Sequence, residues 1–141
     1  FDLTALYPGV LVALDTLAAQ GHRLGLCTNK PAGPARAVLR HFGLDKHMAV
    51  LIGGDSLPQR KPDPAPLYAA LAALGPGPAL FVGDSEVDAE TAQRAGVALA
   101  LFTEGYRKAP IDSLGAKLIF SDFAALPGLV SHLAPRLLPN S

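Results

Sequence analysis

A short apolar run meets two carboxylates in residues 79–93, Ala-Leu-Phe-Val-Gly-Asp-Ser-Glu-Val-Asp-Ala-Glu-Thr-Ala-Gln. The apolar residues 79–82 are too few for a helix and indicate a strand buried on both faces, as in parallel sheets. Alanines at helical spacing follow Asp88, and Gly96 stands where a left-handed residue commonly ends a helix. The stretch predicts strand, turn and helix, with Asp84 at the carboxyl end of the strand.

Asp84 and Asp88 have two interpretations on this stretch alone. Ligands of open α/β sheets bind at the carboxyl ends of the strands, because the loops that leave them form the crevice. Carboxylates there suit a hard cation such as Mg2+, which takes oxygen ligands and few of them from protein. In the structural alternative, Asp84 caps the helix, and Asp88 and Glu90 favour its positive first turn.

The composition indicates a soluble globular chain with one domain. Half of the 141 residues are apolar, which favours a proper core over disorder. The charges of twelve basic and twelve acidic residues cancel, so the chain has no net positive charge that would attract nucleic acid or an anionic membrane. Apolar stretches are interrupted before they reach membrane-spanning length, and no signal-like segment opens the chain. A single cysteine, Cys27, fits a reducing compartment, so we expect a cytoplasmic protein.

Helical and strand patterns alternate along the chain, as α/β folds require. Apolar residues at helical spacing, bounded by proline and glycine, predict each helix. The expected helices cover residues 8–20, 31–42, 65–74 and 88–95, and a last helix, with Asp122 as its candidate cap, keeps the helical period to residue 133. The expected strands cover residues 23–28, 48–52, 79–82, 97–102 and 118–120. The alternation predicts a parallel sheet between layers of helices.

Two further loops after predicted strands carry polar groups. Thr28 and Asn29 end one strand as hydrogen-bond donors. Residues 57–67 hold four prolines, which favour a rigid loop that positions Lys61; the alternative is a connector with solvated charges. Together with Asp84 and Asp88 as cation ligands, these groups form a predicted phosphate-binding site, or phosphate clamp. Such a site suits phosphoryl transfer, because that reaction depends on positioning the phosphoryl group and stabilising its negative charge.

Five stretches resemble the haloacid dehalogenase-like hydrolase superfamily and, within it, the phosphoglycolate phosphatases. They are Tyr7-Pro-Gly-Val10, Leu26-Cys-Thr-Asn-Lys30, Gly53-Gly-Asp-Ser-Leu-Pro58, Arg60-Lys-Pro-Asp-Pro64 and Val82-Gly-Asp-Ser-Glu-Val-Asp88. The resemblance implies a three-layer, Rossmann-like parallel sheet. By position it implies that Thr28, Asn29 and Lys61 bind phosphate, that Lys61 is catalytic by neutralising nucleophile and phosphate, and that Asp84 ligates Mg2+ with support from Asp88.

The family's first motif, a strand that ends in Asp-x-Asp-Gly-Thr and supplies the nucleophile, does not appear in full. The α-helical cap expected between that motif and Tyr7 does not appear either. Residues 1–7 read as a linker, with residues 8–135 as the core domain and residues 136–141 as a loose tail. In the alternative, Phe1-Asp2-Leu3 is a remnant of the first motif and Asp2 is the nucleophile.

Three functions follow from this interpretation. We expect an Mg2+-dependent phosphatase of a small phosphorylated metabolite such as phosphoglycolate, acting through an aspartyl-phosphate whose nucleophile lies outside these residues. No nucleic acid or membrane partner is expected. One alternative is an inactive fragment or a phosphate-binding or interaction domain; another is a dehalogenase or sugar-phosphate mutase. Loss of the first strand is expected to uncover apolar faces around Leu26 and Phe81.

Overall fold

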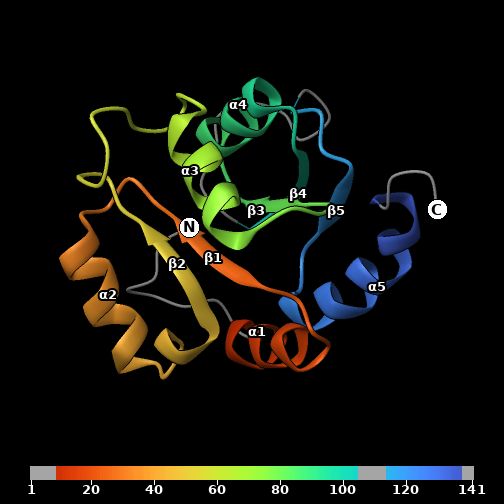
Figure 1. Cartoon of the computed structure of the whole chain (residues 1–141). Coiled ribbons are helices and arrows are strands. Elements are labelled where there is room, and N and C mark those ends of the chain that lie inside the picture. Colours follow the sequence, from red (N-terminus) through yellow and green to blue (C-terminus); the bar gives the residue numbers. More distant parts are fainter. Residues whose placement is uncertain (1–8, 105–113, 138–141) are drawn as a thin grey trace.

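The computed structural model describes residues 9–104 and 114–137, the last five of these by their backbone only. Its helices and strands follow the predicted alternation (Figure 1), which confirms the α/β fold class. The α-helices are α1 Val10–Ala19, α2 Ala32–His41, α3 Ala65–Leu74, α4 Glu86–Ala95 and α5 Leu126–Leu137, with short 3-10 helices at Asp45–His47 and Phe123–Ala125. The strands are β1 Leu24–Cys27, β2 Met48–Ile52, β3 Leu80–Gly83, β4 Ala98–Phe102 and β5 Leu118–Phe120.

The described strands form two parallel sheets where the sequence predicted a single one. β1 pairs with β2, and β4 lies between β3 and β5. β1 and β3 are the strands at which the two sheets face each other, and no hydrogen-bonded ladder joins them within the described residues.

Helices cover both faces of the strands, which gives the three predicted layers. Alternate side chains of β3 and β4, such as Val82 and Phe102, pack against α1 and α5, while Phe81 and Leu101 pack against α4. This alternation follows from the two-residue period of a strand. α3 packs on β1 and β2 beside α4. Among the strands of the described residues, only β4 has a strand on each side, and it is buried at four of its five residues.

Most predicted boundaries are confirmed to within two residues, with three differences. Gly83 ends β3 as its last residue, where the sequence placed it in the turn. Asp122 caps the 3-10 helix Phe123–Ala125 through Ala124 N–H, and α5 begins only after that turn. α5 also continues to Leu137, past the predicted start of the tail. The predicted linker at residues 1–7 and Asp2 lie outside the described residues.

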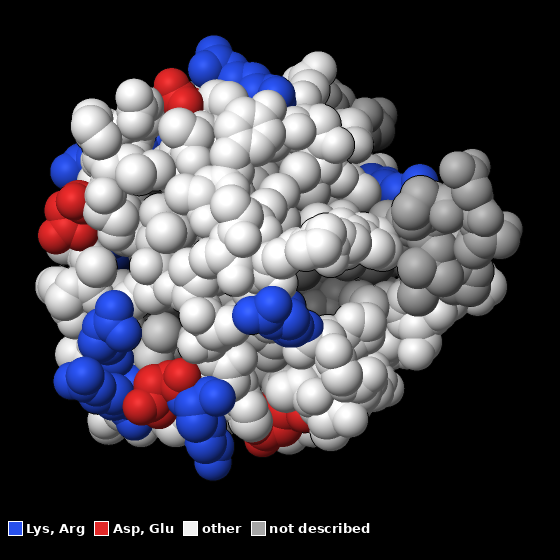
Figure 2. Space-filling view, in the orientation of Figure 1, with Lys and Arg blue, Asp and Glu red and all other residues white. Residues whose placement is uncertain are grey.

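The surface carries charge of both signs. Figure 2 shows that uncharged atoms cover most of one face and that basic and acidic side chains gather together near α2. None of the helices in the described part of the chain has the length and apolarity needed to cross a lipid bilayer.

Candidate functional site

The ends of β1 and β3 meet through the loop that carries Lys61. The Asn29 side-chain amide donates to the Lys61 carbonyl at 3.0 Å, and its carbonyl oxygen accepts from the Lys61 N–H at 3.0 Å. This pair of hydrogen bonds joins residues 32 apart in the chain. Lys61 is thereby held beside the end of β1 by its backbone, which leaves its side chain to reach across to β3.

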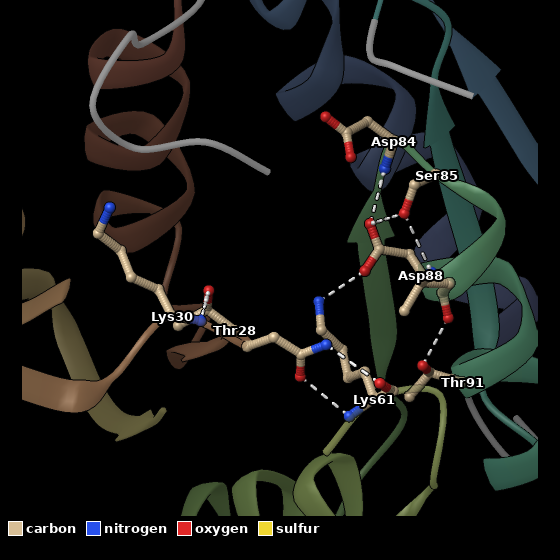
Figure 3. Close-up of polar contacts among 9 residues, drawn as sticks. Thr28, Lys30, Lys61, Asp84, Ser85, Asp88 and Thr91 are labelled. Carbon is tan, nitrogen blue, oxygen red and sulfur yellow. Dashed lines mark hydrogen bonds and ion pairs between the residues drawn. The ribbon is translucent and has the colours of Figure 1, made fainter. Parts of the chain in front are cut away.

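The Lys61 ammonium forms a buried ion pair with Asp88 on α4. Nζ lies 2.6 Å from the Asp88 Oδ1, and the two side chains are only 8% and 3% exposed. The other carboxylate oxygen of Asp88 accepts from the Asp84 N–H at 3.0 Å and from the Ser85 hydroxyl at 3.2 Å. Both oxygens of Asp88 are thus used to tie Lys61 to the start of α4 (Figure 3).

The charge state of Asp88 follows from these contacts. Burial alone would raise the pKa of the Asp88 carboxyl, because a low dielectric disfavours the charged form. The charge and hydrogen bond of Lys61, together with the Asp84 N–H, outweigh burial and hold this pKa below its ordinary value. Asp88 is therefore a carboxylate at neutral pH.

Asp84 lies at the carboxyl end of β3, as predicted, and is 7% exposed. Figure 3 places its carboxylate across from the end of β1, with the Lys61 ammonium between the two strand ends. Thr28 follows β1, where its hydroxyl accepts from the Lys30 N–H at 3.1 Å; a hydroxyl also has one hydrogen to donate. The structure brings the predicted residues to one edge of the sheets.

The carboxylates fit part of a Mg2+ site. Mg2+ is commonly held by one or two carboxylates, with water and substrate phosphate as further ligands. Lys61, the Asp84 N–H and the Ser85 hydroxyl already bond both carboxylate oxygens of Asp88, so Asp88 is placed to support the site, and Asp84 stays the predicted direct ligand. No group of three or more His, Cys, Asp or Glu side chains that could hold a metal ion occurs among the described residues.

The Lys61 loop is fixed at further points. Arg60 Nε donates to the Gly54 carbonyl at 3.0 Å, and Gly54 N–H donates to the Lys30 carbonyl at 2.8 Å. A Cβ on Gly54 would overlap the Asn29 carbonyl, so only glycine permits this approach. The loop after β2 is therefore held against the end of β1, in agreement with the rigidity that its prolines predicted.

Sequence reasoning missed two contributions to this site. Ser85, not Asp84, is the N-cap of α4, because the Ser85 hydroxyl accepts from the Asp88 N–H at 3.3 Å. The serine before an acidic first turn is the signal that could have identified it. The Asn29 amide is committed to the Lys61 backbone, a role that no local pattern indicates.

Comparison with known proteins assigns the family. The family model described as haloacid dehalogenase-like hydrolase matches residues 1–96. The chain belongs to this family. The chain is also 56% identical over 131 residues to a phosphoglycolate phosphatase of Cereibacter sphaeroides and 53% identical over 124 residues to one of Rhodospirillum rubrum. The alignments cover 93% and 86% of the chain and 60% and 52% of these relatives.

Solved structures of other proteins share this fold. A crystal structure described as that of a predicted phosphoglycolate phosphatase from Haemophilus somnus matches 89% of the chain and 57% of that protein, with a TM-score of 0.83 and 40% identity. CbbY from Rhodobacter sphaeroides in complex with phosphate matches with a TM-score of 0.74 and 26% identity, over 84% of the chain and 55% of CbbY. The chain thus spans about three fifths of the length of the Cereibacter sphaeroides relative.

Proposed function

We propose that the chain provides the phosphate- and metal-binding half of a phosphatase that acts on a small phosphorylated metabolite of the phosphoglycolate class. The observation that carries this proposal is the buried Lys61 ammonium, held between the ends of β1 and β3 beside Asp84 and Asp88. A fixed cation beside carboxylates at a strand edge suits a phosphoryl group, whose oxygens carry the charge that must be stabilised. The phosphoglycolate phosphatase relatives support the substrate class.

Each residue has a distinct part in this proposal. Thr28 donates its hydroxyl hydrogen to a phosphate oxygen, and Lys61 stabilises the negative charge of phosphate and nucleophile. Asp84 is the direct ligand of Mg2+, while Asp88 fixes Lys61 and the start of α4. When bound, Mg2+ neutralises phosphate charge and orients the phosphoryl group. Asn29 remains a predicted phosphate ligand, although its amide already bonds the Lys61 backbone.

The nucleophile in this proposal is an aspartate from a segment beyond the described residues. Its carboxylate attacks phosphorus, the alcohol of the substrate leaves, and water then hydrolyses the aspartyl-phosphate to return the carboxylate and inorganic phosphate. In the alternative function, the domain binds phosphate with the same residues but does not carry out these steps. The two functions differ only in the segment that supplies the aspartate.

The proposal is tested by titrating the 141-residue chain with inorganic phosphate and with MgCl2 and following its amide signals by two-dimensional NMR. We expect phosphate to shift amides around Thr28 and Lys61 and Mg2+ to shift those around Asp84. Lys61→Met should weaken phosphate binding at least about tenfold, whereas Lys117→Met, at an exposed position before β5, should leave it unchanged. Binding unaffected by Lys61→Met would overturn the proposal. Hydrolysis of p-nitrophenyl phosphate that depends on Lys61 would select the phosphatase over the binding domain.

A further inference from the structure

The Lys30 ammonium is a second cation at the candidate site, and the proposed function gives it no part. Lys30 follows Thr28 by two residues, in the loop at the carboxyl end of β1. It is partly buried, yet its side chain makes no ion pair and donates no hydrogen bond to the part of the chain that the structure describes. Because removing a charge from water is costly unless the charge is paired, this ammonium suits an anionic group that a ligand brings.

The backbone of Lys30 is fixed on both sides, which sets the point from which its side chain starts. Its N–H donates to the Thr28 hydroxyl at 3.1 Å, and its carbonyl accepts from the Gly54 N–H at 2.8 Å. In Figure 3 the Lys30 side chain extends away from Thr28, and its ammonium and the Asp84 carboxylate lie apart on the two sides of the Lys61 ammonium. Lys30 is therefore anchored beside the predicted phosphate ligand Thr28, while its charge is left for a second group.

The charges of the neighbouring residues leave room for a further cation. Lys61 is paired with Asp88 at 2.6 Å, and Asp84 adds another carboxylate. One ammonium and two carboxylates carry a net negative charge, and the Mg2+ of the proposed function offsets the charge of the phosphoryl group. A ligand with a second negative group would be repelled by this surplus unless another cation faced that group. Lys30 supplies such a cation at the same edge of the sheets.

We propose that Lys30 binds a carboxylate of the substrate and makes the site selective for short phosphate esters that carry a second anionic group. This inference rests on the proposed function, in which the phosphoryl group lies at Thr28, Lys61 and Asp84. The carboxylate meets the Lys30 ammonium, and a hydrogen bond between two charged groups is among the stronger ones in proteins. Because Lys30 and Thr28 belong to one turn, the linker between phosphate and carboxylate is short, as in 2-phosphoglycolate. Lys30 is then a specificity-determining residue of the site.

A lysine that only faced water would influence an anionic ligand in another way. Its charge would act at long range, would be screened by salt and would be matched by other exposed lysines. A direct contact instead distinguishes ligands of equal size by the group that touches the ammonium. Ethyl phosphate is the matched ligand for this comparison, since it carries a methyl group where 2-phosphoglycolate carries its carboxylate.

Titration of the 141-residue chain with both ligands, in MgCl2 and at about 0.15 M salt, tests the contact through its amide signals in two-dimensional NMR. We expect 2-phosphoglycolate to bind at least about tenfold more tightly than ethyl phosphate. Lys30→Met should bring the two affinities to within about twofold of each other and leave the binding of inorganic phosphate unchanged. Lys46→Met, at an exposed position before the amino end of β2, should keep the full preference.

A reversal of charge separates recognition from a structural role of the lysine. Lys30→Glu should bind 2-aminoethyl phosphate more tightly than 2-phosphoglycolate, an inversion that a change in folding alone would not produce. Equal affinities of the parent chain for 2-phosphoglycolate and ethyl phosphate, or a preference that Lys30→Met leaves intact, would overturn this inference even where phosphate binding still depends on Lys61. Absence of phosphate binding would overturn the proposed function and this inference with it.

Discussion

Replacing Asp88 by asparagine should destabilise the fold more than neutralising a carboxylate that is exposed to solvent. Asp88→Asn leaves the Lys61 ammonium, 8% exposed, without its counter-charge 2.6 Å away. Breaking one side of a buried ion pair costs about 3–5 kcal/mol, which is a large part of the roughly 5–15 kcal/mol that stabilises a typical domain. The melting temperature should fall by roughly 10–20 °C.

The matched control is Glu90→Gln on the same helix. Glu90 pairs with Arg94 at 2.8 Å, but the two side chains are about half exposed, at 47% and 53%. A surface pair four residues apart contributes about 0.3–0.5 kcal/mol, so this variant should unfold close to the parent chain. Urea unfolding at pH 7, followed by circular dichroism, gives the unfolding midpoint of each variant. Equal midpoints for Asp88→Asn and Glu90→Gln would refute the assignment of a stabilising role to the buried pair.

The stability difference between the parent chain and Asp88→Asn should also depend on pH. The folded pKa of Asp88 lies below its ordinary value, so the unfolded state takes up the proton first as pH falls. The contribution of Asp88 is fully present above about pH 4, the ordinary range of an aspartate, and is lost as pH falls through the depressed folded pKa. The two unfolding curves should therefore converge in acid. A difference that stays constant down to pH 2 would contradict this linkage.

Three further predictions concern single residues around the site. Gly83→Ala places a Cβ into the Asp88 side chain and should lower the free energy of unfolding by about 1–3 kcal/mol or more through overpacking. Gly33→Ala, in α2, meets no atom within 4 Å of its Cβ and should raise the free energy of unfolding by up to about 1 kcal/mol. Thermal unfolding measures both changes. Burial raises the pKa of the Cys27 thiol, so alkylation by iodoacetamide at pH 7.5 should be at least about tenfold slower than in the urea-unfolded chain, and equal rates would exclude this environment. Asn29→Ala removes two hydrogen bonds to the Lys61 backbone and should cost about 1 kcal/mol, with faster amide exchange at Lys61 as the readout; unchanged exchange would show that other contacts hold the loop.

The order of helices and strands could be predicted from the sequence because its signals are local. Hydrophobic period, proline and glycine are read within one element, and the helix predicted over residues 65–74 and the strand predicted over residues 48–52 have those bounds in the structure. The candidate site was predicted as three separate loops. Their convergence could be expected because polar residues after parallel strands meet at one edge of a sheet.

Contacts between distant residues were decided by the tertiary structure alone. The sequence placed Lys61 in a rigid loop, but Asn29 holds its backbone and Asp88 its ammonium, and these partners lie 32 and 27 residues away. The sequence also predicted β1 and β3 as buried strands, but most of their residues are only half-buried, because the fold sets the two strands as facing edges with a groove between them. The local sequence around a residue indicates its secondary structure and whether its side chain is buried. The residues that its side chain contacts depend on which helices and strands pack together, and the local sequence does not contain that information.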